Sequence, residues 1–123
     1  MRFVTAALAI AAACASAAVA VAAPVRLSDV QFIAANRCLG IESTKAFASP
    51  DVDALRKLVN DNYGRDSYIQ DKADQAREDG ERDASRSSAD VNQRITAERD
   101  SVCRALVGAT TASTPSGTHN MMQ

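Results

Sequence analysis

The three cysteines and one histidine of this chain are the residues best suited to nucleophilic, redox or metal chemistry. The sequence contains no Cys-x-x-Cys pair, and no histidine lies near Cys38 or Cys103 along the chain, so neither thiol has a neighbour that would activate it. His119 and the pair Met121–Met122 are soft metal ligands, but they form one isolated cluster in a Thr/Ser-rich stretch. We therefore predict no catalytic cysteine, no metal site and no cofactor.

Carboxylates are numerous, and adjacent pairs such as Glu78 and Asp79 could serve as acid and base. Catalysis requires such groups to be held in a cleft that shifts their pKa values, whereas this pair lies in a segment without large apolar residues. Asp51, Asp53 and Asp61 could suggest calcium, but the spacing and closing glutamate of an EF-hand loop are missing. A non-enzymatic protein is expected.

The first 22 residues have the composition of a secretory signal peptide. A basic start precedes an apolar run over residues 3–13, and Ala20-Val21-Ala22 fits the small-x-small rule, with cleavage after residue 20 as the alternative. An uncleaved anchor is disfavoured because an alanine-rich stretch is weakly hydrophobic. Lipidation at Cys14 is a minor alternative, because the usual leucine before the cysteine is missing. Arginine outnumbers lysine, as in GC-rich bacterial genomes, and the bacterial periplasm is the expected location.

Removal of the signal peptide leaves two cysteines, Cys38 and Cys103. An exported chain meets an oxidising compartment, so we predict that these two residues form a structural disulfide. The bridge closes a loop of about 65 residues, and in the chain-entropy model it stabilises the fold by about 4 kcal/mol.

The start of a first helix, predicted over residues 29–44, is signalled by a capping box. Ser28 stands at the N-cap and Gln31 three residues later, while Leu27 and Phe32 occupy the two positions of a hydrophobic staple. The apolar residues that follow have helical spacing and predict the buried face: Val30, Ile33, Ala34, Cys38 and Ile41.

A second helix is predicted from Ser49-Pro50-Asp51, because proline is favoured at the first helical position, and Gly64 supplies its end. Its apolar face contains Val52, Leu55, Leu58, Val59 and Tyr63. Phe47, Tyr63 and Tyr68 lie near predicted helix ends, where we expect them to pack inward rather than to form an exposed aromatic surface.

Residues 70–90, the charged segment, contain no large apolar side chain. A helix that is polar all round bridges solvent or depends on ion pairs, so we expect a solvated, charged helical arm able to dock on a partner. Small residues recur along it at helical spacing, a weak coiled-coil signal that would also allow close helix approach in a homodimer: Ala73, Ala76, Gly80 and Ala84.

Large apolar residues resume at helical spacing beyond this segment, as Val91, Ile95, Val102 and Leu106. One unbroken helix over residues 66–107 would be about 63 Å long and would carry Cys103 far from the first helix. Disulfide partners need Cα atoms within about 7 Å. We therefore predict a chain reversal near residues 85–88, with Ser87 as the N-cap of a helix that ends near residues 107–108.

The predicted organisation is a signal peptide (1–22), a helical domain (23–107) and a disordered Thr/Ser/Gly/Pro-rich tail (108–123). Hydrophobic residues make up 46% of the whole chain, but a third of them lie in the signal peptide. The fold class is therefore all-α: a small three- or four-helix bundle or hairpin that needs its disulfide.

The motifs Asn36-Arg37-Cys38 and Ala97-Glu98-Arg99-Asp100-Ser101-Val102-Cys103, following a signal peptide, resemble those of small uncharacterised exported proteins of alphaproteobacteria. These motifs mark the two cysteines. The resemblance implies export and a structural cysteine pair, and it implies no activity. The disulfide-linked acid-stress chaperones of the periplasm share size and class with this chain, but none of their motifs is found.

These observations predict a non-enzymatic periplasmic protein that binds an unknown protein partner through the charged arm or an exposed helix face. A chaperone-like or inhibitory binder in envelope stress is the alternative, and it would show dimerisation or pH-dependent exposure of apolar surface. The net charge of −1 gives no basic footprint for nucleic acid. After signal cleavage no stable membrane insertion is expected, and a homodimer is compatible with the small-residue pattern.

Overall fold

The computed structural model describes residues 25–86 and 88–112, and their regular structure is entirely helical. The elements in chain order are α1 (Asp29–Glu42), η1 (Lys45–Phe47), α2 (Val52–Asp61), α3 (Ser67–Ala84), α4 (Ala89–Glu98), η2 (Arg99–Cys103) and α5 (Arg104–Ala112). η1 is a short 3₁₀ turn, and η2 is a π-helical segment that joins α4 to α5 in one continuous helix. The predicted all-α fold and the chain reversal after α3 are confirmed.

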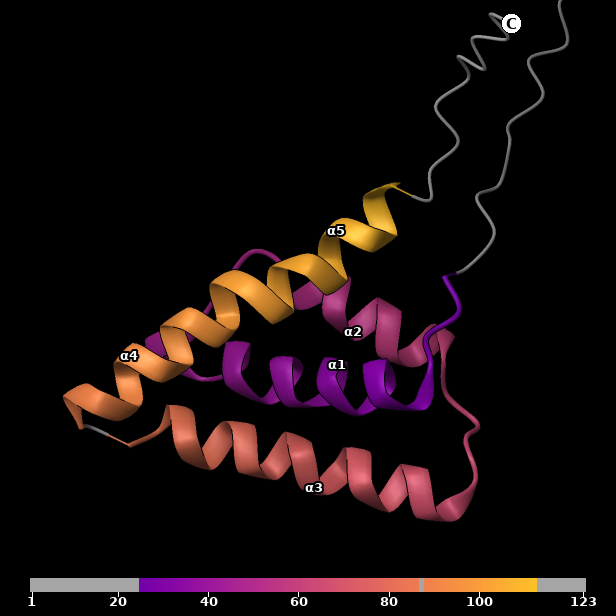
Figure 1. The fold of residues 1–123 in the computed structure, drawn as a ribbon, viewed down its shortest axis with the longest axis horizontal. Coiled ribbons are helices and arrows are strands. Elements are labelled where there is room, and N and C mark those ends of the chain that lie inside the picture. The colour runs from indigo at the N-terminus through magenta and orange to yellow at the C-terminus, as the bar shows by residue number, and fades with distance from the viewer. Residues whose placement is uncertain (1–24, 87, 113–123) are drawn as a thin grey trace, which may run out of the picture.

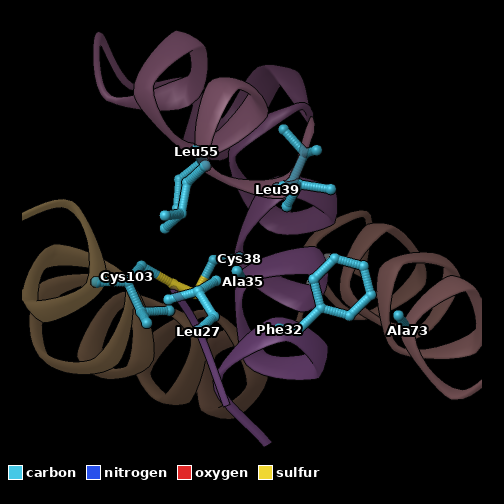
Figure 2. Close-up of a cluster of buried hydrophobic side chains, with 11 residues drawn as sticks. Leu27, Phe32, Ala35, Cys38, Leu39, Leu55, Ala73 and Cys103 are labelled. Carbon is cyan, nitrogen blue, oxygen red and sulfur yellow. A yellow bond between two sulfur atoms is a disulfide. The ribbon is translucent and has the colours of Figure 1, made fainter. Parts of the chain in front are cut away.

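α1 is the central helix of the molecule. Figure 1 shows it between α3 on one side and the continuous α4–α5 helix on the other, and α2 also packs against it. Its buried side chains point in several directions (Figure 2): Phe32 lies toward Ala73 of α3, and Cys38 toward Cys103. Leu55 of α2 completes the same cluster. The core therefore surrounds α1 rather than lying along one face of it.

The capping box predicted for α1 is present. Ser28 Oγ accepts a hydrogen bond from the Gln31 amide at 3.2 Å, and Gln31 Oε1 accepts one from the Ser28 amide at 2.9 Å. Leu27 and Phe32 are both buried in the main cluster, as a hydrophobic staple requires. The predicted buried face was wrong at Val30, whose side chain is 77% exposed. Val30 lies in the first turn of α1, where it lines an open groove between α1 and α5.

The charged segment is helical, but it is not a solvated arm, and this prediction was wrong. α3 packs along α1, and its small residues Ala73, Gly80 and Ala84 are buried. A Cβ atom added at Gly80 would lie 2.5 Å from the Arg37 carbonyl oxygen, and one added at Gly40 would collide with the Arg77 carbonyl. Small side chains thus let the two backbones approach closely. On this side of α1 the helices are held by close backbone packing through small residues, and large apolar side chains of α3 contribute little.

The start and end of the last helix differ from the prediction by a few residues. Ser88, rather than Ser87, caps α4, with Oγ accepting a hydrogen bond from the Val91 amide at 3.3 Å. α5 continues to Ala112, beyond the predicted end at residues 107–108. The remaining tail (113–123) and the predicted signal peptide with Cys14 lie outside the described residues, as does Ser87.

The π-helical segment explains why Val102 is exposed although it shares the helical spacing of Ile95 and Leu106. In a regular helix each residue turns by about 100°, so Ile95 and a residue seven positions later share a face. A π turn contains one additional residue, so each later residue occupies the face that the residue before it would occupy in a regular helix. Ile95 and Cys103 therefore both face the core, at 3% and 0% exposed, while Val102 is 44% exposed.

The aromatic residues divide between core and surface. Phe47 is buried, as predicted, with the Arg99 guanidinium 5.8 Å from its ring centroid. The prediction was wrong for Tyr63 and Tyr68, which are 73% and 66% exposed. α2 ends before Tyr63, so the helical spacing no longer applies to it, and Tyr68 lies in the first turn of α3. Among the described residues, no helix has the length and apolar character needed to cross a membrane.

Candidate interaction surface

An apolar groove of about 370 Å³ lies between the N-terminal half of α1 and α5; we call it the α1–α5 groove. Val30 of α1 and Val102 at the end of η2 are its most exposed large apolar residues, and both are open to solvent. Alanines from both helices line it between them: Ala34, Ala105 and Ala109. Sequence reasoning missed this site because it placed Val30 on the buried face of the first helix and noted Val102 only for its helical spacing.

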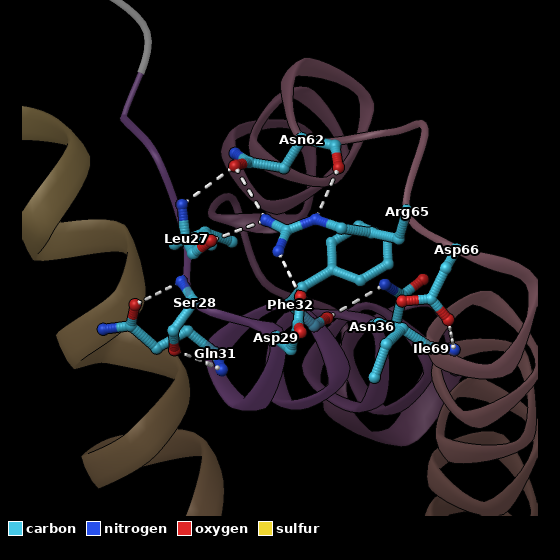
Figure 3. Close-up of polar contacts among 10 residues, drawn as sticks. All are labelled: Leu27, Ser28, Asp29, Gln31, Phe32, Asn36, Asn62, Arg65, Asp66 and Ile69. Atoms are coloured by element: carbon cyan, nitrogen blue, oxygen red, sulfur yellow. Dashed lines mark hydrogen bonds and ion pairs between the residues drawn. The ribbon is translucent and has the colours of Figure 1, made fainter.

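The segment of residues 25–27, just before α1, forms one end of the groove, and Asn62 holds it in place (Figure 3). Asn62 Oδ1 accepts a hydrogen bond from the Leu27 amide at 2.8 Å, and its Nδ2 donates to the Val25 carbonyl at 2.8 Å. Nδ2 also donates to the Leu58 carbonyl within α2 at 2.9 Å. Asn62 is buried, and both the oxygen and the nitrogen of its side-chain amide are hydrogen-bonded, as is usual for buried polar groups. These bonds fix the segment to the end of α2.

Arg65 completes this attachment of the segment before α1. Its Nη2 donates to the Leu27 carbonyl at 2.6 Å, and its Nη1 pairs with Asp29 Oδ1 at 2.5 Å in the first turn of α1 (Figure 3). The guanidinium also lies 5.0 Å from the centroid of the Phe32 ring. Asp29, at a helix N-terminus, is further stabilised by the helix dipole. These contacts fix the segment that forms one end of the groove.

The disulfide links the two walls of the groove, α1 and η2–α5. Cys38 of α1 and Cys103 at the end of η2 are bonded, with Cα atoms 5.5 Å apart, and both are fully buried. The predicted pairing is confirmed. Because the bridge lies beside Val102, it fixes the position of that exposed valine relative to α1. Burial on all sides is typical of a structural disulfide rather than an exposed redox pair.

Arg37 ties α1 to α3 and α4 near the reversal. Its Nε and Nη2 donate to Glu98 Oε1 and Oε2 at 2.6 and 3.1 Å, and Nη2 also reaches Asp83 Oδ2 at 3.1 Å. The hydrogen bond to Glu98 is the largest of the effects that raise the pKa of Arg37. This two-point contact with a carboxylate uses the planar geometry of arginine. The motif residues around the cysteines, Arg37 and Glu98, are thus brought together by the fold.

Glu42 is a charged residue that the sequence did not single out. It is 3% exposed, and its Oε2 has no hydrogen-bond partner within the described structure. Burial raises the pKa of this carboxyl, and the nearby charge of Asp51 raises it further. Arg99 and Arg104 lower it but do not outweigh burial. A buried polar residue on a helix that is surrounded by other helices gives no periodic signal in a sequence.

The remaining sequence candidates do not meet in one site. Glu78 is exposed on α3, and Asp79 pairs with Arg82 at 2.9 Å. Asp53 and Asp61 pair with neighbours on their own helix, Arg56 and Lys57. Within residues 25–86 and 88–112, no group of three or more His, Cys, Asp or Glu side chains is arranged to hold a metal ion. His119, Met121 and Met122 lie outside the described residues.

Comparison of the chain with protein-family models, with curated proteins and with solved structures finds no match. The functional interpretation therefore depends on the geometry of the α1–α5 groove and on the sequence itself.

Proposed function

We propose that this protein is a non-enzymatic, exported helical protein that binds another protein through the α1–α5 groove. The observation that carries the proposal is the pair of exposed valines, Val30 and Val102, at an apolar groove whose walls are rigidly attached. Exposed apolar surface on a small protein costs solubility and commonly marks an interaction site. A fixed frame reduces the entropy lost on binding.

Export to the periplasm forms part of the proposal. It is supported by the composition of residues 1–22 and by the Cys38–Cys103 disulfide, which is typical of oxidising compartments. The groove replaces the charged segment as the proposed contact surface, because the small-residue face of that segment is occupied by α1.

The test is co-purification after chemical crosslinking in the native periplasm, using three variants with matched changes. Val30→Asp and Val102→Asp introduce a charge into the groove, whereas Tyr68→Asp changes an exposed residue on α3 outside it. We expect the two groove variants to lose the same partner that the wild type and Tyr68→Asp retain. Circular dichroism confirms that each variant is folded.

Retention of every partner by the two groove variants would contradict the proposal. Conversion of an ester or glycan substrate by the purified protein, abolished by mutation of one carboxylate, would contradict its non-enzymatic part. The envelope-stress alternative predicts a different result, namely dimerisation or pH-dependent exposure of apolar surface in the purified protein.

A further inference from the structure

We infer that the α1–α5 groove takes an amphipathic α-helix of a partner protein, with an acidic residue of that helix placed against Arg26. This inference rests on the proposed function and specifies the partner's chemistry. Three features of the groove lead to it: its lining by helices, its small side chains, and its single charged residue.

The first feature favours a helix over an extended peptide. The two long walls of the groove are α1 and η2–α5, whose backbone groups are largely used within the helices. An extended peptide in an apolar groove would find few backbone partners there and would bury unpaired amides. A helix satisfies its own backbone and presents only side chains, as in other helix-in-groove complexes.

The second feature sets the depth of contact. Ala34 lies on the α1 side, and Ala105 and Ala109 lie one turn apart on α5. Their short side chains leave room for large aliphatic residues of an incoming helix, and Val30 and Val102 flank the space at its sides. The interval from Val102 to Ala109 is about two helical turns, or ~11 Å. Two or three apolar residues at i, i+3 or i+4, and i+7 of the partner fit this length.

The third feature sets the charge. Arg26 is the charged residue among those lining the groove, it is exposed, and it forms no ion pair with any residue that the structure describes. Asp29, the nearest carboxylate in sequence, is already paired with Arg65. A partner with glutamate or aspartate at the end of its apolar face therefore complements the groove, and a partner with lysine there is disfavoured.

The experiment uses the disulfide-bonded full chain and two synthetic helices of about 14 residues, or ~21 Å. Both carry the same Leu/Ala face and the same covalent staple, so that their helicity is equal. One has glutamates at both ends of the apolar face, and the other has lysines at those positions. Binding is measured by fluorescence anisotropy against wild type, Arg26→Glu, Val102→Asp and Tyr68→Asp.

We expect the glutamate helix to bind wild type about 2–5-fold more tightly than the lysine helix, as for an exposed ion pair. Arg26→Glu should reverse that preference. Val102→Asp should weaken both helices by about 10-fold or more, and Tyr68→Asp should leave both unchanged. Equal binding of the two helices, or a preference that Arg26→Glu does not reverse, would overturn the acidic-helix assignment.

Failure of the inference and failure of the proposed function are distinguishable. If neither helix binds while the periplasmic partner is still lost from Val102→Asp, the groove is an interaction site for another kind of ligand and the inference is wrong. If sedimentation shows a dimer of the wild type that Val102→Asp dissociates, the occupant is a second copy, and the inference is again wrong. If Val102→Asp changes neither partner capture nor helix binding, the proposed function falls as well.

Discussion

The buried carboxylate of Glu42 and the guanidinium of Arg37 lie on the same central helix but in opposite electrostatic situations. Arg37 is paired at two points with Glu98 and at a third with Asp83. Glu42 is more deeply buried, and its Oε2 has no hydrogen-bond partner among the described residues. Breaking a well-paired ion pair is costly, whereas a buried charge that its neighbours compensate only in part is costly to keep. The two residues therefore give predictions of opposite sign.

Arg37→Gln should lower the free energy of unfolding by about 1–3 kcal/mol, because it leaves the half-buried Glu98 without a cation and leaves Asp83 with only the longer 3.9 Å contact to Arg86. Urea denaturation at neutral pH measures the change. Arg56→Gln is the control, since Arg56 forms an exposed pair with Asp53 on α2 and such pairs contribute little. Equal effects of the two substitutions would show that the Arg37 contacts contribute no more than a surface pair.

Glu42→Gln should be more stable than the wild type at neutral pH. Burial raises the pKa of Glu42 in the folded state, so the folded protein binds this proton more tightly than the unfolded chain does. Protonation of Glu42 therefore stabilises the folded state. The free energy of unfolding of the wild type rises as the pH falls from the raised pKa of the folded state toward the lower pKa of the unfolded chain. The advantage of Glu42→Gln should therefore shrink on acidification.

Urea denaturation of both proteins from neutral to acidic pH measures that difference, and Glu78→Gln, at an exposed site on α3, should show none. A Glu42→Gln variant that is less stable than the wild type at neutral pH would mean that Arg99 and Arg104 outweigh burial.

Among the elements, α3 shows most clearly what a sequence pattern can predict. The start of α1 can be predicted because a capping box depends on residues close in sequence. The reversal after α3 can be predicted because a disulfide limits the distance between the Cα atoms of Cys38 and Cys103. The burial of α3 could not be predicted in the same way. Its buried face consists of Ala73, Gly80 and Ala84, and small residues give almost no hydrophobic signal. Their role appears only when Gly40 of α1 is seen opposite Arg77.

The candidate site was less predictable than the fold. The sequence identifies Val102 as apolar but not as exposed, because the π turn in η2 rotates it away from the face that regular spacing predicts. Asn62 and Arg65, which hold the segment at one end of the groove, bond to backbone groups more than 30 residues away. Such contacts depend on tertiary structure and leave no local motif.

Gly80→Ala should destabilise the protein by about 1–3 kcal/mol, because the added methyl group would overlap the Arg37 backbone. The usual gain in helix propensity from Gly to Ala, about 1 kcal/mol, offsets only part of this cost. Gly108→Ala on α5 is the matched control, since a Cβ there meets no atom of the described residues within 4 Å; it should stabilise the protein slightly. Thermal and urea denaturation distinguish the two, and a stabilising Gly80→Ala would contradict close packing of α1 and α3.

On the scale of the whole molecule, the disulfide sets the geometry on which the proposed function depends. It covalently links the central helix to the last one, and Val102, the residue before Cys103, lines the groove. The fold has a small core, so a single bridge across about 65 residues accounts for a substantial share of its stability.

A Cys38→Ser/Cys103→Ser variant should lose about 4 kcal/mol of stability. Because both sulfurs are buried, the native disulfide should also resist mild reductants until the protein unfolds. Non-reducing mass mapping identifies the Cys38–Cys103 peptide, and denaturation of the variant measures the loss. Two free thiols in the native protein, or a variant as stable as wild type, would contradict this role.

Site-specific photo-crosslinking in exporting cells tests the assignment of the groove most directly. A photoreactive amino acid is placed at Val102, inside the groove, and in a second strain at Tyr68, which is exposed on α3 outside it. We expect irradiation to give a discrete adduct with another protein from position 102 and none from position 68. No adduct from position 102, or the same adducts from both positions, would contradict the assignment of the α1–α5 groove as the interaction surface.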